Sequence, residues 1–134
     1  QQEIIMSRRR EEKKLVEEFI KKSEIPGRYE VEKPIPRERV VGKNKVVHNV
    51  LSGLFSLRAD IFIKGDDGLV YIVEAKTRMN PSQLGQLLCY KHLLVKNLGI
   101  DESKVRLIAL VRKKNELEEV FKEYGIEIVE LNGV

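Results

Sequence analysis

Apolar residues three and four positions apart predict a helix over residues 7–22. The apolar positions are Leu15, Val16, Phe19 and Ile20, and charged residues fill most of the others. Pro26 and Gly27 end this pattern. Residues 28–38 hold two prolines and are predicted to be an extended connection, whereas residues 40–47 are predicted to form a strand pair or one bent strand.

A second helix is predicted over residues 80–98. Asn80 is a favourable N-cap, Pro81 suits the first helical position, and Gln83 stands where it would close a capping box. Gly99 supplies a C-terminal stop. The apolar face of this helix consists of Leu84, Leu87, Leu88, Leu94, Val95 and Leu98.

Two β-rich runs in the centre of the chain predict a hairpin. Residues 58–64 and 69–76 flank the turn sequence Gly65-Asp66-Asp67-Gly68. A loop with an odd number of residues, or one with a bulge, would place Gly65 opposite Leu69.

The last third of the chain alternates between β and α patterns. Residues 105–111 are nearly all apolar, as in a strand that is covered on both faces. A helix is predicted to begin with a capping box of Asn115 and Glu118, and residues 126–131 read as a last strand. Such alternation implies parallel strands joined by right-handed crossovers, so residues 1–134 are predicted to form a single α/β domain.

Composition narrows the class of protein. The chain has 134 residues, enough for one core, and its 42% hydrophobic and 34% charged residues exclude a disordered tail and a membrane-spanning protein. The single Cys89 excludes a disulfide framework and a cysteine-based zinc site, and it is expected to be a small buried residue. No signal peptide is visible, so a reducing, cytoplasmic location is expected, although the chain begins without Met.

The net charge of +4 comes from the amino-terminal part of the chain. Residues 1–50 carry 13 Lys and Arg against 9 Asp and Glu, whereas residues 51–134 carry 12 of each. This asymmetry favours a polyanionic partner, and the abundance of Lys, Glu and Arg without Trp fits a thermophile. Neither a membrane partner nor a small-molecule cofactor is expected.

Three charged residues interrupt the apolar runs of the predicted hairpin. They are Asp60, Glu74 and Lys76, and a buried carboxylate is costly unless it is paired, hydrogen-bonded or bound to a metal. Glu74 and Lys76 lie two residues apart and therefore share one face of the strand. The register that pairs Gly65 with Leu69 also sets Asp60 opposite Glu74, whereas a loop of even length would put the two carboxylates on opposite faces.

Two opposed carboxylates indicate a divalent cation between them, because they would otherwise repel each other strongly. Oxygen ligands of this kind suit Mg²⁺ or Mn²⁺, ions that also hold water and bind phosphate oxygens. Lys76 would then position or help deprotonate the attacking water, or neutralise charge on a phosphate.

Asp60, followed after a short hairpin by Glu74-Ala75-Lys76, resembles the PD-(D/E)xK nuclease superfamily. The αβββαβ order of its core matches residues 7 to about 111. The resemblance implies a restriction-endonuclease-like α/β fold, with a central mixed sheet flanked by helices, and a metal-dependent phosphodiesterase that cleaves DNA. It also implies that Asp60, Glu74 and the carbonyl of Ala75 bind the metal and that Lys76 is catalytic.

Further positions resemble one branch of this superfamily. Gln86 and Tyr90 match the Q-x-x-x-Y helix motif of a branch with exonuclease and repair members, and one helix face would carry both. The superfamily often places an acidic residue on its first helix, for which Glu12 is the preferred candidate; the alternatives are Glu11, Glu17 and Glu18. Ala59 stands where the superfamily's name has Pro, a departure shared by many members.

Several basic residues are candidate DNA contacts. Lys43 and Lys45 lie in a predicted turn, Arg78 follows the E-x-K strand, and Arg8 and Arg9 begin the first helix. The expected function is therefore a Mg²⁺- or Mn²⁺-dependent DNA nuclease, acting in repair, recombination or the processing of mobile-element or virus DNA. A homodimer would help so small a nuclease to hold a duplex.

Three alternatives stay open. Holliday-junction resolvases share the compact core and act as dimers, although the Q-x-x-x-Y helix favours the repair branch. A non-catalytic nucleic-acid-binding or assembly module on the same fold would bind DNA without cleaving it. An unrelated α/β interaction domain would require the two carboxylates to lie on different faces of the sheet.

Overall fold

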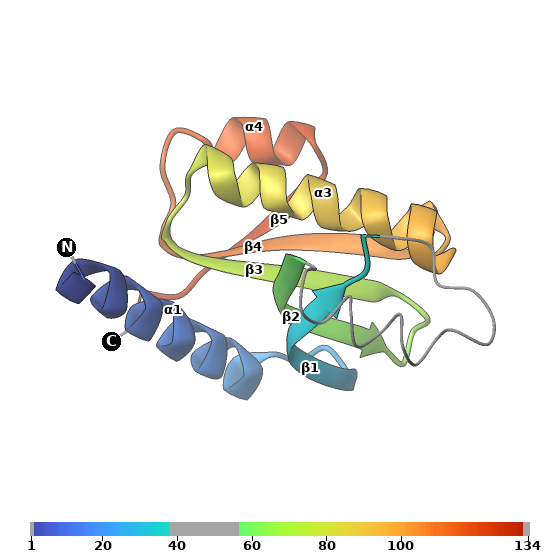
Figure 1. The fold of residues 1–134 in the computed structure, drawn as a ribbon, viewed down its shortest axis with the longest axis horizontal. Coiled ribbons are helices and arrows are strands. Elements are labelled where there is room, and N and C mark those ends of the chain that lie inside the picture. The colour runs from blue at the N-terminus through green and yellow to red at the C-terminus, as the bar shows by residue number, and fades with distance from the viewer. Residues whose placement is uncertain (1, 38–56, 133–134) are drawn as a thin grey trace.

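The computed structural model describes residues 2–37 and 57–132. Figure 1 shows helices on both sides of a twisted sheet. Along the chain the elements are α1 (Gln2–Lys22), β1 (Gly27–Ile35), β2 (Leu57–Gly65), β3 (Val70–Arg78), α3 (Pro81–Leu98), the 3₁₀-helix η2 (Glu102–Lys104), β4 (Val105–Lys113), α4 (Glu118–Glu123) and β5 (Ile126–Glu130).

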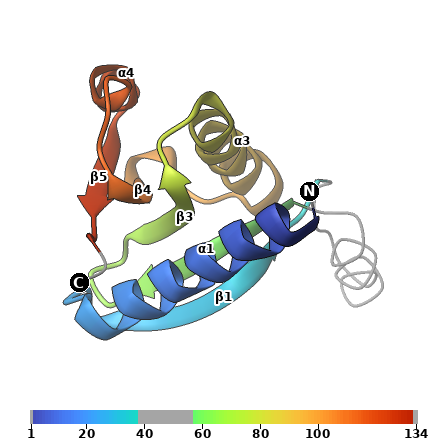
Figure 2. The ribbon, with the colours of Figure 1, turned by 90° about the vertical axis from the view of Figure 1, so that its left-hand side faces the viewer.

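The five strands form one mixed sheet in the order β1-β2-β3-β4-β5. The pairs β1–β2 and β2–β3 are antiparallel, whereas β3–β4 and β4–β5 are parallel. Figure 2 shows α1 on one face of this sheet and α3 with α4 on the other. The predicted αβββαβ order and the parallel strands of the last third are confirmed.

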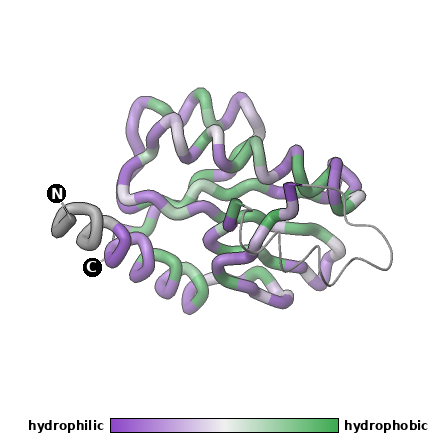
Figure 3. Tube along the Cα trace, in the orientation of Figure 1, coloured by the Kyte–Doolittle hydropathy of each residue, from purple (hydrophilic) through white to green (hydrophobic). Residues whose placement is uncertain are grey.

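Two apolar clusters hold these layers together. On the α1 side Leu15 and Phe19 pack against Ile61, Val73 and Ile108. On the α3 side the cluster includes Ile72, Ala59, Leu87, Tyr90 and Leu94. Successive residues of β4 alternate between the two clusters, which confirms that this strand is covered on both faces. In Figure 3 the hydrophobic residues accordingly follow the central strands.

β1 corrects the prediction of an extended connection over residues 28–38. It is a nine-residue strand paired with β2 in a register that sets Pro34 opposite Arg58. Proline is tolerated there because β1 lies at the edge of the sheet, where one side of the strand needs no ladder donor. The strand pair predicted for residues 40–47 lies outside the described residues.

The two predicted capping boxes are not formed. Asn80 accepts a hydrogen bond from the backbone N–H of Gln83 at 2.8 Å, but the Gln83 side chain turns into the sheet. Asn115 accepts from Leu117 N, donates to Met79 O and precedes a helix of only six residues. The start and stop of α3 are nevertheless as predicted, with Gly99 in the left-handed conformation at φ 67°.

None of the helices in the described part of the chain combines the length and the apolar character needed to cross a membrane.

Candidate active site

The hairpin of β2 and β3 has the register that the sequence predicts. Its turn is closed by a hydrogen bond from Gly65 N to Leu69 O at 2.8 Å, and Gly68 adopts φ 85° within an odd-numbered loop. Ile61 consequently pairs with Val73. Asp60 and Glu74, the next residues outward, therefore stand opposite each other.

Beyond Ile61 and Val73, side chains replace the backbone ladder. The backbone N–H of Asp60 donates to Oε1 of Glu74 at 3.3 Å, and that of Ala75 donates to Oδ2 of Asp60 at 2.8 Å. The Asp60 carboxylate thus accepts the Ala75 N–H, which a regular antiparallel ladder would direct to a carbonyl of β2. The Asp60 N–H, which in that ladder would face β1, is turned to Glu74 instead. The two acidic groups are fixed between β2 and β3.

The strands are distorted at this place. Ala59 packs in the cluster beneath α3 while Ile61 packs in the cluster beneath α1, although residues two apart normally share a face. On β1, Glu32 lies between the partners of these two residues and adopts φ 50°, which is unusual for a residue other than glycine. Tyr90 of α3 donates from its hydroxyl to Arg58 O at 2.9 Å and so holds β2 one residue before the distortion that begins at Ala59.

Burial makes this carboxylate pair hard to ionise. Glu74 is only 3% exposed, and burial followed by the charge of Asp60 raises the pKa of Glu74 to about 8. Burial also raises the pKa of Asp60, against the opposing effect of the Ala75 N–H and of Lys76. The positive charge near the two carboxylates is therefore too small to keep both pKa values low, and a bound cation would supply the missing charge.

Lys76 and Glu12 both act on this pair. The positive charge of Lys76 lowers the pKa of Asp60 and of Glu74, and the negative charge of Glu12 raises that of Glu74. α1 thus brings Glu12 within electrostatic reach of Glu74.

Three other acidic residues of α1 were candidates for the same place. Glu11 and Glu18 instead contact Arg112, at 3.6 and 2.5 Å, and Glu17 is exposed. Of these four residues, Glu12 is the one whose charge raises the pKa of Glu74.

Of the two Q-x-x-x-Y residues on α3, Tyr90 reaches the carboxylate pair. Tyr90 is 1% exposed, and burial together with the charges of Glu74 and Asp60 raises its pKa well above the usual range for tyrosine. Gln86 lies one turn earlier, and its buried Oε1 has no hydrogen-bond partner among the described residues. α3 therefore brings the hydroxyl of Tyr90 into the surroundings of the pair.

Sequence reasoning missed the contribution of Gln83. This side chain is completely buried and donates from Nε2 to Glu74 O at 2.9 Å and to Leu110 O at 3.3 Å. The sequence pattern predicts only a capping role for this residue. The signal available was a long amide side chain in the first turn of a helix that directly follows the E-x-K strand.

Of the predicted DNA contacts, the structure describes two side chains. Arg78 is exposed at the end of β3, and Arg9 is exposed on α1. Arg8 lies in α1 but its side chain is outside the description, and Lys43 and Lys45 lie outside the described residues altogether.

The donor set fits a small divalent cation. In the described part of the chain, no three His, Cys, Asp or Glu side chains are close enough to hold a metal by themselves. Mg²⁺, however, needs only one or two carboxylates when water and phosphate complete its shell. The Ala75 N–H points toward Asp60 on β2, so the carbonyl of Ala75 is expected on the same side of β3, where it would offer a third oxygen.

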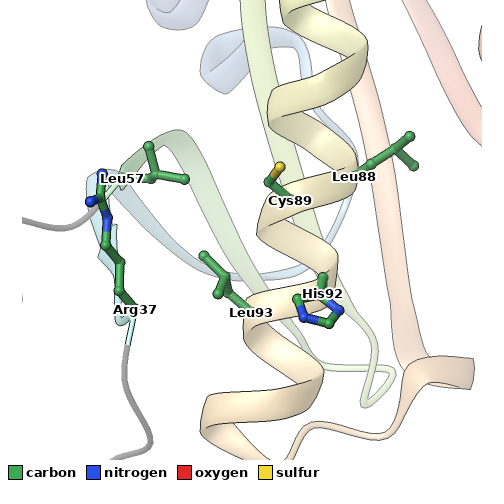
Figure 4. Close-up of a pocket in the computed structure, with 6 residues that line it drawn as sticks. All are labelled: Arg37, Leu57, Leu88, Cys89, His92 and Leu93. Carbon is green, nitrogen blue, oxygen red and sulfur yellow. The ribbon is translucent and has the colours of Figure 1, made fainter.

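A surface pocket of about 470 Å³ lies apart from these residues. Figure 4 shows its lining by Arg37, Leu57, Leu88, Cys89, His92 and Leu93. None of the predicted site residues contributes to this lining. Cys89 is exposed, which corrects the prediction of a buried residue: it lies on the outer side of α3, whereas Leu87 and Tyr90 face the sheet.

The carboxylate pair stands in an α/β fold, a mixed five-stranded sheet flanked by helices. Two solved structures of EndoMS share this fold: the apo form (TM-score 0.54, 21% identity, covering 90% of this chain and 45% of that chain) and a complex with dsDNA (0.54, 21%, 87% and 42%). A repair endonuclease from Pyrococcus abyssi also matches (0.48, 22%, 76% and 39%). The chain spans less than half the length of these proteins.

No protein-family model matches the chain, and no curated protein sequence does.

Proposed function

We propose that the protein is a metal-dependent DNA nuclease that hydrolyses phosphodiester bonds. The observation that carries the proposal is the buried pair of Asp60 and Glu74, which replaces backbone hydrogen bonds between two strands and stands beside Lys76. Such an arrangement destabilises the fold and needs a functional reason, because strongly perturbed carboxylates concentrate at active sites.

The roles follow from the oxygen atoms and charges. Asp60, Glu74 and the Ala75 carbonyl would hold Mg²⁺ or Mn²⁺, with Glu12 acting directly or through water. When bound, the ion would supply Lewis acidity at the phosphate and a more acidic water. Lys76 would orient that water or stabilise the charge that develops on the phosphate. Gln86 and Tyr90 would support the site from α3.

DNA as the substrate rests on three supports. The motif of the chain resembles that of the PD-(D/E)xK superfamily. EndoMS, which has the same fold, is solved in complex with dsDNA. Arg78, which follows the E-x-K strand, is exposed. The described cations Arg78 and Arg9 would contact backbone phosphates, as would Arg8, Lys43 and Lys45. Repair, recombination or the processing of mobile-element or virus DNA would employ such an enzyme, as a monomer or a homodimer.

The test is cleavage of labelled single-stranded, duplex and four-way-junction DNA in Mg²⁺, Mn²⁺ or EDTA. We expect cutting that requires the metal and is lost in Glu74→Gln, with folding intact. A folded wild-type protein that binds these DNAs in Mg²⁺ and Mn²⁺ but cuts none of them would contradict the nuclease and favour a binding module. The product pattern separates exonuclease, endonuclease and resolvase.

A further inference from the structure

Three consecutive cations at the end of β4 differ in what they contact. Arg112 binds Glu18 of α1 and also donates to Leu131 O, and Lys114 lies 3.5 Å from Glu118. Lys113 is exposed and has no acidic partner among residues 9–37 and 57–132. Strand alternation explains the difference, because Arg112 faces α1 together with Leu110 while Lys113 points to the opposite face.

The register partner of Lys113 is Arg78 on the parallel strand β3. Arg78 is also exposed and also lacks an acidic partner in the described part of the chain. Two neighbouring like charges repel each other, so nothing in the fold itself explains their pairing. Alternation places Arg78 on the same face of β3 as Glu74 and Lys76, roughly 13 Å along the strand from Glu74.

We propose that Arg78 and Lys113 together bind one backbone phosphate of the DNA, adjacent to the phosphodiester held at the carboxylate pair. This inference rests on the proposed nuclease function and adds Lys113 to its substrate-binding surface. A guanidinium fork and an ammonium group offer complementary contacts to one phosphate, and the phosphate removes their mutual repulsion.

The experiment measures binding of fluorescent duplex DNA in EDTA over a range of salt concentrations, so cleavage is not required. The variants are Arg78→Gln, Lys113→Gln and the double variant, with Lys114→Gln as the matched control because Lys114 is already ion-paired. We expect Lys113→Gln to weaken binding about 3–10-fold and to lower the slope of log K against log salt by roughly 0.9. The double variant should lower the slope by little more, because one phosphate is shared.

Equal effects of Lys113→Gln and Lys114→Gln would overturn the phosphate site, as would fully additive slopes in the double variant. If the wild type cuts DNA and Lys113→Gln binds DNA normally, the proposed phosphate site is wrong and the proposed nuclease function stands. If the variants show the expected binding pattern but the wild type cuts no DNA, the phosphate site stands and the nuclease function is wrong. Melting temperatures should be unchanged in all variants.

A second inference comes from the buried side chain of Gln83. Its Nε2 joins carbonyls of β3 and β4, but its Oε1 is buried without a hydrogen-bond partner among the described residues. A half-satisfied amide is a poor choice for stability, since an apolar side chain of equal size would fill the same space without an unpaired atom. The structure assigns Gln83 as a positioning residue that locks α3 to the peptide of Glu74.

The test compares Gln83→Met with Asn97→Met. Asn97 is a matched control because it is a buried amide on the same helix that donates to Pro36 O, outside the candidate site. We expect Gln83→Met to leave the denaturation midpoint unchanged or higher, to speed hydrogen exchange of the Lys76 amide at least 10-fold, and to slow DNA cleavage by a similar factor. Asn97→Met should lower the denaturation midpoint and leave the hydrogen exchange of the Lys76 amide and the rate of DNA cleavage unchanged.

Hydrogen exchange at Lys76 tests the positioning role even if the protein proves not to cut DNA. A lower midpoint with unchanged local exchange in Gln83→Met would show a structural residue and overturn the assignment. Unchanged exchange together with unchanged cleavage would overturn it too.

Discussion

Two aspartates on the β2–β3 hairpin have pKa values that are shifted in opposite directions. Asp67 at the tip accepts a hydrogen bond from Leu69 N at 2.9 Å, and Asp60 at the base accepts one from Ala75 N at 2.8 Å. The pKa of Asp67 is lowered by the hydroxyl of Tyr71 and by this N–H, whereas the pKa of Asp60 is raised by burial. The same backbone bond thus accompanies opposite shifts, because solvent access decides which effect is larger.

The backbone hydrogen bonding also differs between the tip and the base of the hairpin. At the tip the ladder is regular as far as Ile61 and Val73, and the Asp67 side chain only reinforces the turn. At the base the carboxylates of Asp60 and Glu74 take the place of the ladder. The tip therefore carries a carboxylate that stabilises the hairpin, and the base carries two whose burial costs stability.

Neutral amides at the two ends should separate these roles most clearly. Asp60→Asn and Glu74→Gln are expected to reduce metal-dependent DNA cleavage by roughly two to four orders of magnitude, because each removes a charged ligand of the proposed metal. Asp67→Asn should leave the cleavage rate within about twofold of wild type. Single-turnover rates on one duplex measure all three, and equal losses at tip and base would end the distinction.

The pH dependence of stability should also come from the base. A carboxyl group with a raised pKa makes the folded chain bind more protons than the unfolded chain, so stability falls as pH rises. In EDTA, the free energy of unfolding of wild type should decrease between pH 4.5 and about 8, the window set by Glu74, by on the order of 1–3 kcal/mol. Urea titrations of Glu74→Gln should show a much flatter profile over this window.

The tip should act at acid pH and in the opposite direction. Because the pKa of Asp67 is depressed, its contribution is present above the ordinary pKa of aspartate and disappears as pH falls through the folded-state value. Asp67→Asn should therefore be slightly less stable than wild type at neutral pH and equal to it in strong acid. Thermal melts across that range would expose an error if the gap between the proteins widened as pH fell.

The smallest effect is expected at Glu32, beside the distorted base. Its φ of 50° is costly for a residue with a Cβ, so Glu32→Gly should stabilise the protein or leave it unchanged, within about 1 kcal/mol. Glu32→Ala serves as the control that removes the carboxylate and keeps the strain. A marked loss of stability in the glycine variant alone would show that the conformation carries little strain.

The sequence was sufficient to predict the structure at the tip of the hairpin, and it predicted the structure at the base only in part. Gly68 lies in an odd-numbered loop, and the resulting register brings Asp60 opposite Glu74. Spacing predicted this proximity on condition that the loop is odd-numbered or bulged, and left the even-numbered loop open. Local patterns could not reveal that the strands open there, because the positive φ of Glu32 depends on tertiary context. Nor did they reveal Gln83, whose partners lie 9 and 27 residues away in the chain.

Elsewhere a sound local rule gave a wrong result. Pro34 argued against a strand over residues 28–38, yet an edge position removes the objection. Glu12, by contrast, was chosen because it faces inward one turn before Leu15, and the structure brings it within reach of Glu74. Helix periodicity is a local property, whereas the place of a strand in a sheet is not.

The Asp60–Glu74 pair is proposed to destabilise the fold on its own and to be relieved by a divalent cation. The most direct test is the free energy of unfolding at pH 8, measured for wild type and Glu74→Gln in EDTA and in Mn²⁺. We predict that Glu74→Gln is the more stable protein in EDTA, and that Mn²⁺ stabilises wild type but not the variant. Equal stabilisation of both proteins by Mn²⁺, or of neither, would contradict the claim.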